Sequence, residues 1–205
     1  MISKKDKIYI LNLVKKHTPE ILKVINFDPS VKEVGHSFGD RYEDELVLRL
    51  LKESSDFTEP TETRSPDDLK YKGNFINIKF GYKKNGQPNI CSMKRLFMKL
   101  HTNEIDSYYL ISVDAYGPDY KMFDVYDYLD YTNFNYGTGQ LMLCESKLNK
   151  VYDINKEFNL TKKEKIVIMG NMMRKELDRH KELKENQQMI IDRIKNSYES
   201  SLLQG

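Results

Sequence analysis

The sequence predicts an α/β protein with a central mixed β-sheet, flanking helices and a long helical segment at the C-terminus. Three observations lead to this prediction. Two apolar-alternating runs meet at a glycine turn within residues 65–81, which is typical of a β-hairpin. A basic helix at 93–100 is followed by a buried strand at 107–116 and an alternating strand at 121–128. Dense Lys and Glu with an intermittent apolar stripe then predict a helix over 161–198.

The first part of the chain is expected to be helical. Apolar positions between residues 5 and 24 predict two short helices, separated near Pro19, with Thr18 capping the second. A stronger apolar stripe predicts a helix over residues 41–53, with Asp40 as its cap. Glu43 lies on the same side of this helix as the stripe. A carboxylate there needs a cationic partner, so Glu43 either forms a salt bridge or serves as an acid of a metal or active site.

The chain of 205 residues is long enough for one folded core, which we place at residues 1–158, with a helical extension at 159–205. Cys91 and Cys144 are isolated in the sequence, so neither a disulfide framework nor zinc-ligand spacing is present. The sequence shows no apolar signal segment and no run of transmembrane length. We therefore expect a cytoplasmic protein that does not enter a membrane.

The net charge is only +2, yet the charges are unevenly distributed. Residues 69–103 contain no Asp or Glu but carry eight Lys and Arg residues, whereas the following segment is acidic. A basic run of this kind is often a solvated surface, but it also suits a face that binds a polyanion such as DNA.

The predicted hairpin at 65–81 carries the candidate chemistry. In its second strand Asn77 and Lys79 share one face, and three apolar residues share the other. If the chain turns at Gly73 and Asn74, an aspartate from the start of the hairpin approaches Asn77 and Lys79. Carboxylate and amide oxygens suit Mg²⁺, and a lysine beside them suits phosphodiester hydrolysis. The alternatives are a solvated turn for the aspartates and a surface position for Lys79.

These residues resemble a known signature. The relevant residues are Pro66, Asp67 and Asp68, followed by Asn77, Ile78 and Lys79. They are similar to the PD-(D/E)XK motif of nucleases that include the type II restriction endonucleases. The resemblance extends over roughly residues 40–116, because a helix precedes the motif and a basic helix follows it. It implies a restriction-endonuclease-like core, an endonuclease that uses Mg²⁺, double-stranded DNA as the substrate, and a homodimer.

The resemblance also implies roles for individual residues. The family's aspartate begins a strand with apolar residues at the next and third-next positions, which favours Asp68 over Asp67. Asn77 departs from the family pattern, which has Asp or Glu there, so Glu43 becomes a candidate for the missing acid. Asp68, Asn77 and Glu43 would hold the metal, and Lys79 would polarise the attacking water.

Further residues are candidates for DNA contacts. They follow the catalytic strand or lie in a glycine turn: Lys83, Lys84, Asn89, Ser92, Lys94, Arg95, Thr138 and Gln140. The turn that contains the last two can equally be a plain hairpin turn. Two other functions stay open. One is a structure-selective nuclease, such as a junction resolvase or a phage recombination exonuclease. The other is a DNA-binding relative that lost catalysis at Asn77.

Overall fold

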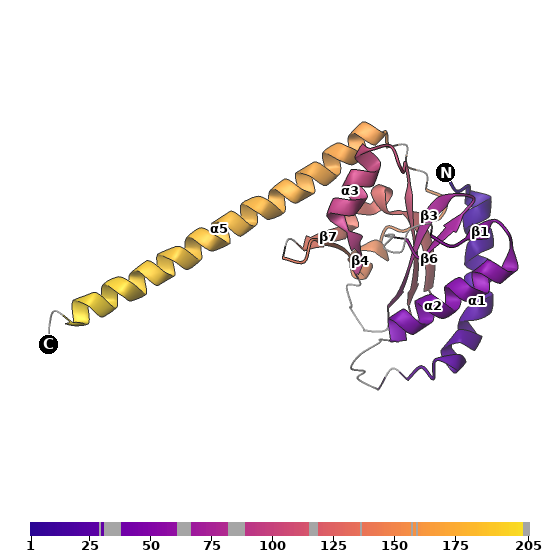
Figure 1. The fold of residues 1–205 in the computed structure, drawn as a ribbon, viewed down its shortest axis with the longest axis horizontal. Coiled ribbons are helices and arrows are strands. Elements are labelled where there is room, and N and C mark those ends of the chain that lie inside the picture. Colours follow the sequence, from indigo (N-terminus) through magenta and orange to yellow (C-terminus); the bar gives the residue numbers. More distant parts are fainter. Residues whose placement is uncertain are drawn as a thin grey trace.

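The predicted fold class is confirmed: the protein is α/β, with a mixed central sheet flanked by helices and a long C-terminal helix (Figure 1). The computed structural model describes residues 1–28, 30, 38–60, 67–81, 89–114, 119–135, 137–156, 158 and 160–202. Within these residues, no helix combines the length and the apolar character needed to cross a membrane.

The central sheet has five strands in the order β1-β2-β3-β5-β6. These strands are β1 (Phe57–Thr58), β2 (Leu69–Tyr71), β3 (Asn74–Gly81), β5 (Tyr108–Asp114) and β6 (Asp119–Asp124). β3 and β5 run parallel, and the other neighbours run antiparallel. The parallel pair needs a crossover, which contains β4 (Asn89–Ser92) and α3 (Met93–His101). The chain segment after the candidate hairpin is therefore carried across one face of the sheet.

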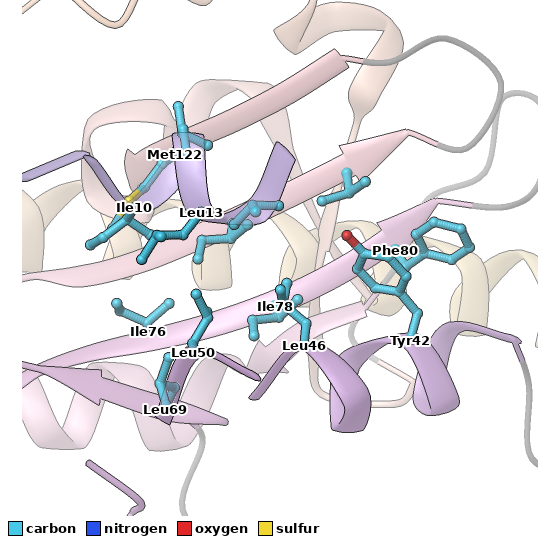
Figure 2. Close-up of a cluster of buried hydrophobic side chains, with 14 of the residues drawn as sticks. Ile10, Leu13, Tyr42, Leu46, Leu50, Leu69, Ile76, Ile78, Phe80 and Met122 are labelled. Atoms are coloured by element: carbon cyan, nitrogen blue, oxygen red, sulfur yellow. The ribbon is translucent and has the colours of Figure 1, made fainter. Parts of the chain in front are cut away.

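Helices α1 (Lys4–Val24) and α2 (Phe38–Glu53) cover one face of this sheet (Figure 1). Ile76, Ile78 and Phe80 alternate along β3 toward these helices and are buried. Figure 2 shows Leu46 and Leu50 of α2 among these β3 side chains, where they form one apolar cluster. The predicted apolar face of the hairpin is thus buried behind the candidate site.

α1 is one continuous helix, so the predicted break near Pro19 is wrong. Its buried residues, among them Ile10, Val14 and Ile21, lie on both sides of the proline and pack in the same core. Thr18 does not cap a second helix. Its hydroxyl donates to the Val14 carbonyl at 2.7 Å and also hydrogen bonds to the Tyr42 hydroxyl at 2.7 Å. Packing against α2 and the sheet therefore outweighs the cost of a proline inside the helix.

α2 begins at Phe38, earlier than predicted, so Asp40 lies in the first helical turn and is not the cap. The predicted apolar stripe is present, with Leu46 and Leu50 fully buried. Glu43 lies one turn before this stripe, at the edge of the helix that approaches β3.

The opposite face of the sheet packs against α3 and a small second sheet of order β4-β8-β7. The remaining elements here are β7 (Thr132–Asn135), β8 (Gln140–Leu143), α4 (Glu145–Leu148) and the 3-10 helix η1 (Val125–Tyr131). The strand predicted at 121–128 is therefore too long: β6 ends at Asp124, whose side chain accepts from the Tyr126 N–H and starts η1.

The hairpin turn lies one residue earlier than predicted. Tyr71 pairs with Asn74, so Lys72 and Gly73 form the two-residue loop. Both have positive φ, 47° and 77°, which is typical of a type I′ turn.

α5 (Lys162–Leu202) begins with the predicted capping box, because Thr161 and Glu164 exchange side chain–backbone hydrogen bonds. Its first turns belong to the core, where Met169 is fully buried. Beyond them the helix extends away from the body of the protein (Figure 1).

Candidate active site

The candidate site forms at the open edge of β3. β2 begins only at Leu69, opposite Ile76, whereas β3 continues past Ile76 to Gly81. Asp68 closes the end of this ladder. Its backbone N–H donates to the Ile76 carbonyl at 3.0 Å, and its Oδ2 accepts from the Ile78 N–H at 2.7 Å. A side-chain carboxylate thus occupies the place where the next strand residue would pair.

Glu43 of α2 reaches the same edge one step further along. The Phe80 N–H donates to its carboxylate, and Lys79 Nζ lies 2.6 Å from Glu43 Oε2. Both side chains of this ion pair are 16% exposed, so the pair is largely removed from water. The salt bridge expected for Glu43 therefore exists, and its partner is the lysine of the nuclease-like motif.

Burial and nearby negative charges raise the pKa values of both carboxylates. Burial raises the pKa of Glu43 to about 7, and the Asp68 charge adds to this, while Lys79 and the Phe80 N–H oppose it. Burial also raises the pKa of Asp68; the Asp44 charge adds to that shift, and Lys79 and the Ile78 N–H oppose it. A positive charge bound between Glu43 and Asp68 would reverse these shifts. Carboxylates with strongly perturbed pKa values are candidates for a functional site.

Asp67 faces different cations from its neighbour. The charges of Lys70 and Lys99 lower the pKa of Asp67, whereas the charge of Lys79 lowers the pKa of Asp68. Asp67 is only 4% exposed, and no other described residue hydrogen bonds to its carboxylate oxygens. Burial therefore dominates and raises its pKa to about 6. The structure brings Asp68, not Asp67, beside Lys79 and Glu43.

Asn77 lies on the sheet face that also carries Lys79, as the alternation predicts. It is buried and pairs with Leu110 of β5 in the sheet register, two positions before the pairing of Lys79 with Ser112. The hydrogen bonds of Asp68 to Ile76 and Ile78 flank Asn77, so Asp68 and Asn77 face each other across the hairpin.

An acidic pocket of about 600 Å³ opens beside these residues. Besides Glu43 and Asp68, its lining includes Asp40 and Asp44 of α2, which the sequence analysis did not assign to the site. Asp40 lies three residues before Glu43 and four before Asp44, and residues at these spacings share one side of a helix. The sequence alone could therefore have indicated this acidic side of α2.

The residues present fit a magnesium ion better than a zinc ion. In the described part of the chain, no three His, Cys, Asp or Glu side chains are grouped to hold a metal. Mg²⁺ needs only one or two carboxylates because it keeps several waters, and the donors here are oxygens. Cys91 is buried and the pKa of its thiol is raised to about 12 by burial, so it is not a thiolate ligand or nucleophile.

Most of the predicted DNA-contacting residues gather around the start of α3. Ser92 caps α3 as predicted, because its hydroxyl accepts from the Arg95 N–H, and it pairs with Gln140 in the small sheet. Lys94 and Arg95 are exposed on the first turn of α3. The β7–β8 connection is a hairpin turn, in which Thr138 is exposed, and the Met93 N–H donates to the Gly139 carbonyl at 3.0 Å.

Of the other three predicted contact residues, the structure describes only Asn89. Asn89 is exposed at the start of β4, where it pairs with Met142. Lys83 and Lys84 lie outside the described residues.

No family model matches the chain, and no curated protein matches it. Among solved structures, the chain is similar to one described as "Restriction endonuclease in complex with substrate DNA", with 15% sequence identity and a TM-score of 0.45. The similarity covers 77% of this chain and 90% of that chain.

Proposed function

We propose that this protein is a Mg²⁺-dependent endonuclease of the restriction type, which hydrolyses phosphodiester bonds in double-stranded DNA. One observation carries the proposal. A half-buried lysine on a central strand is paired with one carboxylate and lies beside a second, and both carboxylates accept from backbone N–H groups of the same strand edge.

Asp68 and Glu43 would hold the Mg²⁺ ion, with the amide oxygen of Asn77 as a further neutral donor. When bound, the ion would neutralise the scissile phosphate and make an attacking water more acidic. The raised pKa values of Glu43 and Asp68 support this role, because cation binding relieves the cost of two buried negative charges.

Lys79 acts on the reacting groups. One N–H of its ammonium group donates to Glu43, which holds the group at the site, and the two remaining N–H donors can orient a water and stabilise the negative charge that develops on the phosphate. Lys94 and Arg95 would contact DNA phosphates, and Gln140 and Asn89 would reach base edges or sugars.

The test uses the full chain, mixed-sequence plasmid DNA and Mg²⁺. The wild-type protein should give discrete fragments, and Lys79→Ala should reduce the cleavage rate by at least about a hundredfold. Lys52→Ala is the matched control, because Lys52 is an exposed lysine on α2 away from the pocket, and it should cleave as the wild type does. Equal cleavage by Lys79→Ala and the wild type would overturn the proposal.

A second candidate function is sequence-selective DNA binding without cleavage. The substitution of an amide, Asn77, for the family's acid favours it. In addition, no three His, Cys, Asp or Glu side chains among the described residues are grouped so that they could hold a metal ion. Binding without Mg²⁺-dependent cleavage would support this function. Cutting confined to branched DNA or DNA ends would instead indicate a structure-selective nuclease.

We also propose that the enzyme acts as a homodimer. The apolar side chains exposed on the distal part of α5 support this proposal, because a second copy of the chain would cover them.

A further inference from the structure

A separate pocket of about 440 Å³ lies at the other end of the central sheet. It forms where the starts of α1 and α5 meet Tyr109 near the start of β5 and Asp124 at the end of β6. Lys79 lies further along the strands, where its partner in β5 is Ser112. The two pockets share no lining residue.

Besides Lys165, three lysines line this pocket: Lys4, Lys7 and Lys156. Lys7 Nζ lies 5.7 Å from the ring centroid of Tyr109, and Lys156 Nζ lies 4.7 Å from that of Phe158. Aromatic faces hold an ammonium group in place without neutralising it. Among the described residues, no carboxylate lies within 4.0 Å of the amines of Lys4, Lys7 or Lys156.

The two acids of the pocket do not cancel these charges. Asp124 is already satisfied: it accepts from the N–H groups of Tyr108 and Tyr126, and Lys165 Nζ lies 3.5 Å from its Oδ2. Asp127 is half-buried, and burial together with the Asp124 charge raises its pKa to about 7. The charges of Lys165 and Lys7 oppose this rise in pKa, so Asp127 offsets only part of the lysine charge near neutral pH.

Two helix starts add to the positive potential. α1, a helix of 21 residues, begins at Lys4 behind the capping residue Ser3, and α5 begins directly after Thr161. Ser3 and Thr161 both line the pocket. The N-terminal end of a helix carries partial positive charge, which favours an anion. The carboxylates of Asp6 and Glu164, in the first turns of α1 and α5, offset part of this potential.

We propose that this pocket binds a small organic phosphate, of the class of a nucleoside monophosphate. The phosphate group suits Lys4, Lys7 and Lys156, since a compact dianion can engage several ammonium groups at once. Asp127 accepts a hydrogen bond from an amino or hydroxyl group of the ligand. The side chains of Ile154, Phe158 and Leu160 cover its apolar part. The volume is in the range of small-molecule sites.

The experiment measures binding of deoxyadenosine monophosphate to the full chain by titration calorimetry, with deoxyadenosine and inorganic phosphate as reference ligands. The monophosphate should bind more tightly than either reference ligand. Lys7→Gln and Lys156→Gln should each weaken it by at least about tenfold, because each removes a charge-assisted contact to the phosphate.

Lys5→Gln is the matched control, since Lys5 is an exposed lysine next to Lys4 that does not line the pocket. Its affinity should equal that of the wild type. Asp127→Asn provides a second readout: it should strengthen the binding of inorganic phosphate, because it removes a negative charge beside the anion. The proposal is overturned if millimolar monophosphate does not bind, if inorganic phosphate binds as tightly, or if the Lys7→Gln and Lys156→Gln proteins bind like the Lys5→Gln protein.

Discussion

At the scale of single residues, the two adjacent aspartates of the hairpin have different environments. The carboxylate of Asp68 accepts a hydrogen bond from the β3 backbone, and the charge of Lys79 lowers its pKa. Asp67 is buried, and the charges of Lys70 and Lys99 lower its pKa. A one-residue step along the chain therefore separates an acid that can act with Lys79 from one that cannot.

This difference predicts opposite results for two otherwise identical substitutions. Asp68→Asn should abolish Mg²⁺-dependent cleavage, because it removes a negative charge from the proposed metal site. Asp67→Asn should leave cleavage within a fewfold of the wild-type rate. Plasmid cleavage assays measure the activity of both variants, and titration calorimetry measures their Mg²⁺ binding. Loss of Mg²⁺ binding in Asp67→Asn, with full binding in Asp68→Asn, would assign the metal to the other aspartate.

Asp67 also predicts a pH dependence of stability. Its pKa is about 6 in the folded protein and 3.8 in the reference state, so the folded state binds more protons between these values. The free energy of unfolding therefore falls as the pH rises from about 4 to about 7. Asp67→Asn removes this loss and should stabilise the protein by about 1–3 kcal/mol at pH 8.

Urea unfolding of both proteins checks this prediction. The stabilisation by Asp67→Asn should be large at pH 8 and small at pH 4, where the aspartate is protonated in either state. An equal difference at both pH values would show that the substitution acts through packing and not through the charge.

The sequence predicts some of the site residues but not all of their contacts. The apolar stripe of α2 correctly predicts that Glu43 faces inward, and strand alternation places Asn77 and Lys79 on one face. The contact between Glu43 and Lys79 joins residues 36 positions apart, so it depends on how α2 packs across the β3 edge. No local pattern contains that information. Asp44 was overlooked although its helical spacing to Asp40 indicated a shared side.

At the scale of elements, the β2–β3 hairpin depends on its turn. Gly73 has a φ of 77°, a conformation that is unfavourable for residues with a Cβ atom. Gly73→Ala should therefore destabilise the protein by about 1–2 kcal/mol. A looser hairpin would also displace Asp68 from the β3 edge, so cleavage should fall as well.

Gly170→Ala is the matched control for this prediction. Gly170 lies inside α5, and no atom lies within 4 Å of the position of an added Cβ. Because alanine is the better helix former, this substitution should stabilise the protein by about 0.5–1 kcal/mol. Chemical unfolding of both variants measures whether each substitution raises or lowers the free energy of unfolding. Stabilisation by Gly73→Ala would contradict the proposed strain in the turn.

The sequence predicts an element well where the spacing of its apolar residues matches the positions that are buried in the fold. β3 and β5 follow this rule, because Ile76, Ile78 and Phe80 alternate along β3 and are all buried, and β5 is buried on both faces. α1 and η1 do not. Pro19 indicates a break that core packing overrides, and the Asp124 side chain ends β6 by starting a 3-10 helix within an alternating pattern.

At the scale of the whole molecule, α5 carries a face that the protein itself does not cover. Its root packs on the core through Met169 and Met172. Ile190 follows Met172 after 18 residues, which is five full helical turns, so both lie on the same side of α5. Leu183 and Ile194 lie close to this line, at heptad-like spacings of seven and four residues. The apolar side of α5 that packs on the core near Met172 therefore continues along the exposed part of the helix.

A second copy of the chain is the partner that we expect on this face, and two neighbouring residues test it. Ile190 and Met189 are 56% and 52% exposed, but their side chains point about 100° apart around the helix. In sedimentation equilibrium the wild-type chain should have twice its 24.2 kDa mass. Ile190→Lys should weaken the dimer at least tenfold, because symmetry introduces the lysine twice into the interface. Met189→Lys should leave the dimer unchanged. A wild-type protein that sediments as a monomer at all concentrations, or equal effects of the two substitutions, would rule out this face as the dimer interface.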